Sequence, residues 1–476
     1  MTRYQHLAAL LQQRIEHGLY QCGERLPSVR ALSEEHGVSL STVQQAYHLL
    51  EARRLIIPQP RSGYYVAPRK ATPPMPGLTR PAQRPVEISQ WESVLELFNN
   101  CPENSEFNFG GGSPDIDQSS LAPLWKSLTR LCQRQDPRVM SYGNMFGAAE
   151  LREQVARLTL DSGCRLTEDD IVITTGCQEA LFTAIRAVCQ PGDIVAVESP
   201  TFPGTMQILR GLGIKAIEIP TCAVTGISLD ALELALEQWP VKAVLMVPTC
   251  NNPLGFTMPD KYKKALIVLA QRFDLAIIED DAYGELAYEY PRPRTIKSFD
   301  EDGRVLLCSS FSKSIAPGLR VGWIAPGRYL ERVLHTKYIS TGYTVTHTQL
   351  AVAEFIRQGD YQPHLRRMRM QYKSNLEVFT CWVRHYFPSE ICVSRPQGGF
   401  LVWIELPESF DTLRLNREVS AAGIKIAAGS LFSASGKYRN CLRLNYARPF
   451  TEEVEKGLRL LGESASRLLE EATTAK

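Results

Sequence analysis

Residues 305–323, VLLCSSFSKSIAPGLRVGW, hold a lysine, Lys313, shortly after a run of small and apolar residues. Such a run is typical of a strand buried within a sheet. Similar runs occur upstream as IVITT, IVAVE, AVLMVP and LAIIED, with helical stretches such as PDKYKKALIVLAQRF among them. Short buried strands that alternate with amphipathic helices indicate a mostly parallel α/β sheet. The lysine is therefore expected just beyond the end of a sheet strand.

The chain has 476 residues, which is too long for one ordinary core and predicts two or three domains. The segment ATPPMPGLTRPAQRPV, residues 71–86, contains five prolines and no apolar periodicity, as expected for a semi-stiff linker. A helix is expected from Trp91, and a smaller C-terminal α+β lobe after about Pro363. We therefore predict a head at 1–70, a linker at 71–90 and a body at 91–476.

The composition, with 44% hydrophobic and 22% charged residues, is that of a globular protein. No apolar run approaches the roughly 20 residues that span a bilayer, and the N-terminal segment lacks the apolar block of a signal peptide. The twelve cysteines form no CxxC pair, which favours reduced thiols over disulfides or zinc ligands. We expect a cytoplasmic protein with no metal site and no membrane partner.

Charge is unevenly distributed along the chain. Residues 1–70 hold nine Lys and Arg against five Asp and Glu, a net charge of +4, and the remaining residues hold 44 against 46, a net charge of −2. A basic head on a near-neutral body points to a polyanionic partner for the head. A surplus of this size is also common on small solvated domains.

The N-terminal 70 residues show three helical patterns. The first has one apolar face, formed by Leu7, Leu10, Leu11 and Ile15, and Gly18 follows as its expected C-cap. A second helix is expected from Ser28 to Gly37, and Ser39 can cap a third. Four residues of the third helix would face the core, at helical spacing: Val43, Ala46, Tyr47 and Leu50.

A predicted hairpin follows, formed by RLIIPQP and YYVAP around Arg61, Ser62 and Gly63. A helix, a helix-turn-helix and a hairpin make a winged helix-turn-helix. By pattern alone, this module could equally be a helical protein-interaction domain with a polar face.

Three segments favour DNA binding over protein interaction. GERLPSVR, GVSLSTVQQAYHLLEARRLI and RSGYYV, within residues 5–67, resemble the DNA-binding domain of the GntR family. The resemblance implies binding to double-stranded operator DNA. Arg30 would contact phosphate, Gly63 would let the wing approach the minor groove, and the recognition helix would present Ser39, Ser41, Thr42 and Gln44 to the major groove.

One position departs from many members of that family, which carry arginine where this chain has Leu40. A strong guanine contact would then be absent. Specificity would instead come from thymine-methyl contact, from DNA shape, or from Gln44 and Gln45.

The body carries a second set of motifs. By itself Lys313 is as readily a solvated loop residue, but the sequence also contains SYGNMFG, TTGCQEAL, ESPTFPG, PTCNNPLG, EDDAY, SFSK with PGLR, GGGSPD and CLRLNY. In this combination they are similar to the motifs of the fold-type I aminotransferases of class I/II, over roughly residues 106–460. That resemblance implies an enzyme-like fold that binds pyridoxal 5′-phosphate (PLP).

The same resemblance implies a role for each residue. Lys313 would carry PLP as a Schiff base and would be the catalytic residue if the body is active. The phosphate would be held by Gly176, Cys177, Gln178, Ser310, Ser312 and Arg320, and by Tyr142 of a neighbouring subunit, which implies a homodimer with shared sites. The ring would be bound by Phe202, Asn252, Asp280 and Tyr283. A ligand carboxylate would lie at Gly112 and Arg443.

A GntR-type head, a proline-containing linker and an aminotransferase-like body together resemble the MocR subfamily of regulators. We therefore expect a PLP-dependent transcription regulator that senses PLP or an amino-acid-like effector. In our hypothesis, the effector places its carboxylate on Arg443 and displaces the lysine. The lobes then move and change the spacing of the two heads. Such a change requires that the effector bind the two conformational states of the protein with different affinities.

Two alternatives remain open from the sequence. The first is a functional aminotransferase with an appended DNA-binding module, because the residues expected for turnover are all in place. The second is a PLP-binding scaffold that has lost DNA binding, which the wing and the basic head disfavour.

Overall fold

The computed structural model of the chain describes residues 2–59, 62–67, 72–88, 107–117, 119–134 and 137–474. It divides into two compact units. One holds residues 1–74, 374–391 and 449–476, and the other holds residues 75–373 and 392–448. The helix expected from Trp91 lies outside the described residues. The predicted boundaries of head, linker and body stay a prediction.

The head consists of three helices and a hairpin, as the sequence predicts. Its elements are α1 (Arg3–Glu16), α2 (Val29–His36), α3 (Leu40–Ala52), β1 (Ile56–Gln59) and β2 (Gly63–Val66). The four residues predicted to face inward from α3 are fully buried. Ser28 and Ser39 cap α2 and α3 with their hydroxyls. The first helix has its C-cap at His17, one residue before the expected Gly18.

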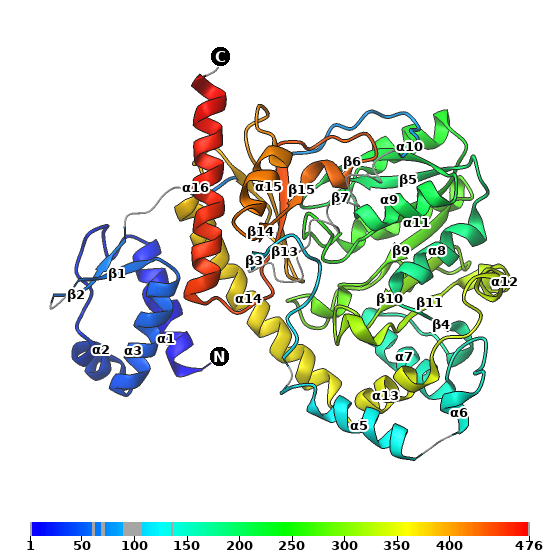
Figure 1. Cartoon of the computed structure of the whole chain (residues 1–476), viewed down its shortest axis with the longest axis horizontal. Helices are drawn as coiled ribbons and strands as arrows, with labels where there is room; N and C mark the ends of the chain where they lie inside the picture. Colours follow the sequence, from blue (N-terminus) through cyan, green and yellow to red (C-terminus); the bar gives the residue numbers. More distant parts are fainter. Residues whose placement is uncertain are drawn as a thin grey trace. The chain divides into compact units, whose positions relative to one another are not determined.

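The large domain is built on an eight-stranded, mostly parallel sheet (Figure 1). The strand order is β4-β11-β10-β9-β8-β5-β6-β7, and the five central strands β10, β9, β8, β5 and β6 run parallel. The strands are β4 (Val172–Thr174), β5 (Ile194–Ser199), β6 (Lys215–Cys222), β7 (Gly226–Ile227), β8 (Val241–Met246), β9 (Ala276–Asp280), β10 (Val305–Ser310) and β11 (Gly322–Ala325).

Helices cover both faces of this sheet because successive strand residues point to opposite sides. Ile278 and Val197 pack with α8 (Cys177–Val188), α9 (Pro203–Gly211) and α12 (Leu330–Ser340). Ile277 and Ala196 pack with α10 (Leu229–Gln238) and α11 (Asp260–Arg272) on the other face. Further helices in the described part of the large domain are α5 (Ala122–Gln133), α6 (Pro137–Met140), α7 (Ala149–Thr159) and α13 (Thr346–Arg357).

The second unit also holds the expected smaller α+β lobe. Its sheet has the order β12-β13-β16-β15, and a separate parallel pair joins β14 to β3. The elements are β3 (Phe107–Asn108), β12 (Cys392–Val393), β13 (Leu401–Glu405), α15 (Thr412–Ser420), β14 (Ile424–Lys425), β15 (Ala427–Ala428) and β16 (Cys441–Asn445). The later part of α14 (Tyr361–Tyr386) and all of α16 (Glu452–Thr474) belong to the first unit.

Part of the proline-containing segment is bound to the large domain. Val86 exchanges two backbone hydrogen bonds with Ala216 of β6, at 2.9 and 3.1 Å, and the Thr79 hydroxyl donates to the carbonyl of Ser199 at 2.7 Å. Ile88 is buried in the core beside α8 and α9. Residues 79–88 therefore pack on the large domain. None of the described helices is long and apolar enough to cross a membrane.

Candidate functional site

A cavity of about 530 Å³ lies where the parallel strands of the large sheet end. Asp280 ends β9, Ser310 ends β10, and Val247 directly follows β8. In open α/β sheets, ligands bind beyond the carboxyl ends of the strands. Twelve of the fourteen residues predicted for the body line this one cavity: Gly112, Cys177, Gln178, Phe202, Asn252, Asp280, Tyr283, Ser310, Ser312, Lys313, Arg320 and Arg443.

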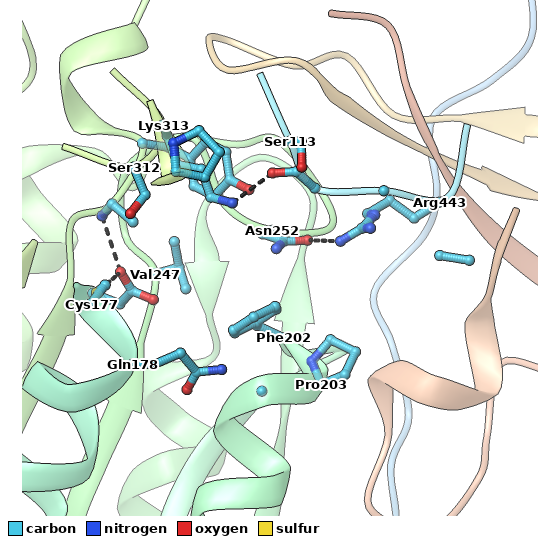
Figure 2. Close-up of a pocket in the computed structure, with 18 of the residues that line it drawn as sticks. Ser113, Cys177, Gln178, Phe202, Pro203, Val247, Asn252, Ser312, Lys313 and Arg443 are labelled. Carbon is cyan, nitrogen blue, oxygen red and sulfur yellow. Dashed lines mark hydrogen bonds between the residues drawn. The ribbon is translucent and has the colours of Figure 1, made fainter. Parts of the chain in front are cut away.

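Lys313 projects from the turn after β10 into the cavity (Figure 2). Its Nζ donates to the carbonyl oxygen of Gly112 at 2.6 Å. Burial and the positive charge of Arg443 lower the lysine pKa to about 8, against the opposing influence of Asp280. A larger share of the amine is thus neutral near pH 7, as bond formation to an aldehyde requires.

Asp280 is the acidic residue of EDDAY that faces the cavity. Its Oδ1 accepts from the Ala282 backbone N–H at 3.0 Å and from the Cys177 thiol at 3.3 Å. Burial raises its pKa to about 6. Asp281 instead pairs with Arg292, at 2.6 and 2.7 Å. Asp280 is thus available to a cationic ring nitrogen, whose charge would stabilise the carboxylate.

The corner where β4 leads into α8 has groups that suit an anion. The α8 N-terminus presents backbone N–H groups, as at many phosphate sites. Gly176 caps the helix with φ of +90°, and a β-carbon there would lie 2.6 Å from Arg320 Nη2. Arg320 is held by the Thr175 carbonyl at 2.9 Å. Gly176 itself does not line the cavity, but it provides the room that Arg320 occupies.

Phe202 and Gln178 line the side of the cavity that faces Lys313 and Asn252. In Figure 2, Lys313, Asn252 and Arg443 lie above Gln178, Phe202 and Pro203. A β-carbon on Gly204 would collide with the Phe202 ring and the Gln178 amide. Gly204 therefore maintains this wall. Gly204 is not among the residues predicted from the sequence, although its place in ESPTFPG is a usable signal.

Arg443 of β16 is buried, and burial lowers its pKa. Its Nη1 donates to Asn252 Oδ1 at 3.2 Å and its Nη2 to the Gly110 carbonyl at 2.5 Å, while its Nε has no partner among the described residues. Burial also raises the pKa of Tyr283, which keeps its phenol a hydrogen-bond donor. Buried donors of this kind suit a carboxylate and a ring oxygen.

Tyr142 lies away from the cavity and is 89% exposed. Its ring contacts that of Tyr343, with centroids 5.0 Å apart, and Met140 and Val345 are also exposed nearby in the chain. Within one chain it does not reach the residues that the resemblance assigns to PLP.

The predicted DNA-binding residues lie on one helix pair and the wing. Arg30, Ser39, Ser41, Gln44 and Gly63 are exposed and Thr42 is half-buried. The Ser39 hydroxyl lies 2.9 Å from that of Ser41 and 2.8 Å from that of Thr42. Leu40, the first residue of α3, is 48% exposed. Arg25, which is not among the residues predicted from the sequence, packs beside the wing at Gly63.

Two family models match the chain. Residues 3–66 match the gntR family of bacterial regulatory proteins, and residues 105–461 match aminotransferase class I and II. The uncharacterized HTH-type transcriptional regulator YjiR of Escherichia coli (strain K12) is 59% identical over 470 residues, covering 99% of this chain and all of YjiR. The HTH-type transcriptional regulator TauR of Rhodobacter capsulatus is 28% identical, covering 95% of this chain and 94% of TauR.

Solved structures match the body. LysN, the α-aminoadipate aminotransferase of Thermus thermophilus, solved with N-(5′-phosphopyridoxyl)-L-leucine, has a TM-score of 0.72 at 27% identity. The match covers 79% of this chain and 95% of LysN. The multiple substrate aminotransferase of Thermococcus profundus has a TM-score of 0.74 at 27% identity, covering 80% of this chain and 96% of that enzyme.

The fold, the paired family matches and the full-length likeness to HTH-type transcriptional regulators agree with one another. The fold-type I architecture predicted for the body is confirmed, as is the winged helix-turn-helix head. The chain belongs to the MocR-type regulators of the GntR family, in which a DNA-binding head is fused to an aminotransferase class I and II domain.

Proposed function

We propose that this transcription regulator carries PLP on Lys313 and couples the state of that site to the DNA binding of its head. The observation that carries the proposal is the cavity that gathers Lys313, Asp280 and Arg443. An amine with a lowered pKa, a buried carboxylate and a buried guanidinium are the groups that PLP and an amino-acid ligand require.

The residues present fit PLP. The α8 N-terminus, Ser310, Ser312 and Arg320 would hold the phosphate, and Asp280 would face the ring nitrogen. Phe202 would lie against the ring, and Tyr283 and Asn252 would donate to its oxygen. When bound, PLP supplies an aldehyde that links to amines and a ring that withdraws electrons.

Lys313 and Arg443 would then have different roles toward a ligand. Arg443 would bind the ligand's carboxylate through Nε, which has no partner among the described residues. Asn252 and Gly110 keep the guanidinium in place. When its amine is free, Lys313 can take up or release a proton at Nζ near pH 8. A ligand that binds the two states of the cavity differently shifts the protein between them, and this shift would change the spacing of the heads.

A homodimer with shared sites is part of the proposal. Tyr142, Met140, Tyr343 and Val345 expose apolar surface that a second copy would cover. Tyr142 would then reach the phosphate in the neighbouring subunit. The cytoplasm is the expected location, because an operator-binding protein acts where the chromosome is.

The proposal is tested on the DNA upstream of the protein's own gene. We expect footprints at moderate salt that change when PLP, or PLP with an amino-acid panel, is added. Lys313→Ala should abolish both the visible band of bound PLP and the response, while Lys126→Ala, on the exposed face of α5, should preserve both. Absence of protection with holo-protein would contradict the proposal.

A functional aminotransferase is the second candidate, favoured by the pKa of about 8 at Lys313 beside Asp280, Asn252 and Arg443 in the same cavity. Single-turnover spectroscopy distinguishes the two. Rapid conversion of bound PLP to its amine form by one amino donor would favour the enzyme, whereas binding without conversion favours the sensor.

A further inference from the structure

We infer that Lys425 binds a second anionic group of the ligand, so that the cavity takes amino acids with an acidic side chain. The inference rests on the proposed function, because it assigns a ligand class to the same cavity. It is carried by a buried cation that no role described above uses.

Strand pairing brings Lys425 to the cavity. In the parallel pair of β14 and β3, Lys425 lies opposite Asn108 and Ile424 lies opposite Phe107. Ile424 and Phe107 are buried apolar residues on one face of the pair. Because side chains alternate along a strand, Lys425 and Asn108 lie on the other face. Both of these residues line the cavity.

Lys425 is only 6% exposed, and its Nζ has no hydrogen-bond partner among the described residues. The other buried lysines of the described chain are satisfied: Lys263 donates to the Arg294 carbonyl, Lys297 to Asp300 and the Val305 carbonyl, and Lys337 to the Met145 carbonyl and Thr344. A buried ammonium without a partner is costly, so a counter-charge from a ligand explains its position.

The position of Lys425 relative to Arg443 defines the class of ligand. Arg443 lies opposite Ala427 in the β15–β16 pair, and Lys425 precedes Ala427 by two residues, about 7 Å along an extended chain. One carboxylate on Arg443 and another at Lys425 therefore match an amino acid whose side chain ends in a carboxylate. Three apolar residues of the lining would contact the methylene groups between them: Ala427, Leu431 and Phe432.

The test uses ligands that cannot react with PLP. Holo-protein is titrated by calorimetry with glutarate, which has a carboxylate at each end, and with pentanoate, which has the same length and one carboxylate. We expect glutarate to bind at least tenfold more tightly. Lys425→Met should reduce glutarate affinity to that of pentanoate and leave pentanoate within twofold. Lys425→Arg should keep the preference, as should Lys215→Met, which removes an exposed lysine of β6.

Each other outcome overturns the inference. Equal binding of both acids to the wild-type protein, no binding of either, or equal weakening of both by Lys425→Met would each do so. The proposed function is judged separately, by the visible band of PLP on Lys313 and the footprint. If those persist while the glutarate preference is absent, the assignment of Lys425 alone fails.

Discussion

Arg443 Nη1 donates to Asn252 Oδ1 over 3.2 Å, although the two residues are 191 positions apart in the chain. This bond orients the Asn252 amide so that its NH₂ group remains to donate elsewhere. A guanidinium proposed for a ligand carboxylate and an amide proposed for the PLP ring oxygen are thus coupled directly.

The first prediction concerns this pair. Arg443→Gln should weaken the binding of carboxylate ligands about tenfold to a hundredfold, the usual effect of losing a charged hydrogen bond. Because the glutamine amide can still donate to Asn252 Oδ1, Asn252 should keep its orientation and the visible band of bound PLP should persist. Absorbance titrations measure both the affinity for carboxylate ligands and the band of bound PLP. Unchanged carboxylate affinity would remove Arg443 from the proposed ligand site.

The second prediction concerns the pH dependence of PLP loading. With a pKa of about 8, about one-tenth of Lys313 amines are neutral at pH 7. The loading rate of apo-protein should rise with pH and level off just above 8, whereas the reaction of Nα-acetyl-lysine should still rise beyond 9. Arg443→Gln removes a positive charge and should move the midpoint upward. A midpoint near 10 in the wild-type protein would contradict the prediction.

The third prediction concerns Glu198, a fully buried residue of β5. Its Oε2 accepts from the Val247 N–H at 2.8 Å and the Asn251 amide at 2.9 Å, and burial raises its pKa to about 8. The folded protein keeps this carboxyl protonated while the unfolded chain ionises it above about 4.5. Rising pH therefore lowers the free energy of unfolding progressively between about 4.5 and 8.

Glu198→Gln cannot ionise and should escape that loss. The variant should match the wild-type protein near pH 5 and exceed its free energy of unfolding by on the order of 2 to 3 kcal/mol near pH 7. Denaturant melts of the apo-protein from pH 5 to 8 measure the difference. Glu237→Gln, at an exposed site of α10, should show no such trend. A difference that is constant with pH would exclude this explanation.

The fourth prediction concerns Arg30, which is exposed at the start of α2. If it contacts phosphate, Arg30→Ala should weaken binding to specific and unrelated DNA alike, by about tenfold. The dependence of log affinity on log salt should become shallower by about one. Arg210→Ala, an exposed arginine of α9, serves as the control. A loss restricted to one DNA sequence would assign Arg30 to base recognition instead.

The fifth prediction concerns the shared site. Homodimers of Lys313→Ala and of Tyr142→Phe should each bind PLP poorly. Mixed dimers should regain one intact site, formed by Lys313 from one protomer and Tyr142 from the other. Absorbance titration of the mixture measures the recovery, and equal deficits before and after mixing would place Tyr142 outside the site.

Local patterns made much of this molecule predictable. Ser39 and Tyr47 follow from helix capping and helical spacing, and Lys313 follows from a lysine placed beyond a buried strand. The motif residues Asp280 and Asn252 share one cavity because parallel strands end at the same edge of a sheet.

Contacts set by strand register were not predictable. Lys425 stands in an ordinary apolar run, and only its pairing with Asn108 brings it to the cavity. Likewise, the prolines around Thr79 indicate an extended segment but not its binding to the edge of the large sheet. Pairing partners that are distant in sequence leave no local signal.

The attachment of Thr79 and Val86 to the large domain shortens the segment that can act as a free linker. The described part of the head ends at Ala67, twelve residues before Thr79, and a fully extended chain of that length spans about 40 Å. The chain between the described head and Thr79 can be no longer than this, because residues 79–88 belong to the large domain and not to a free linker.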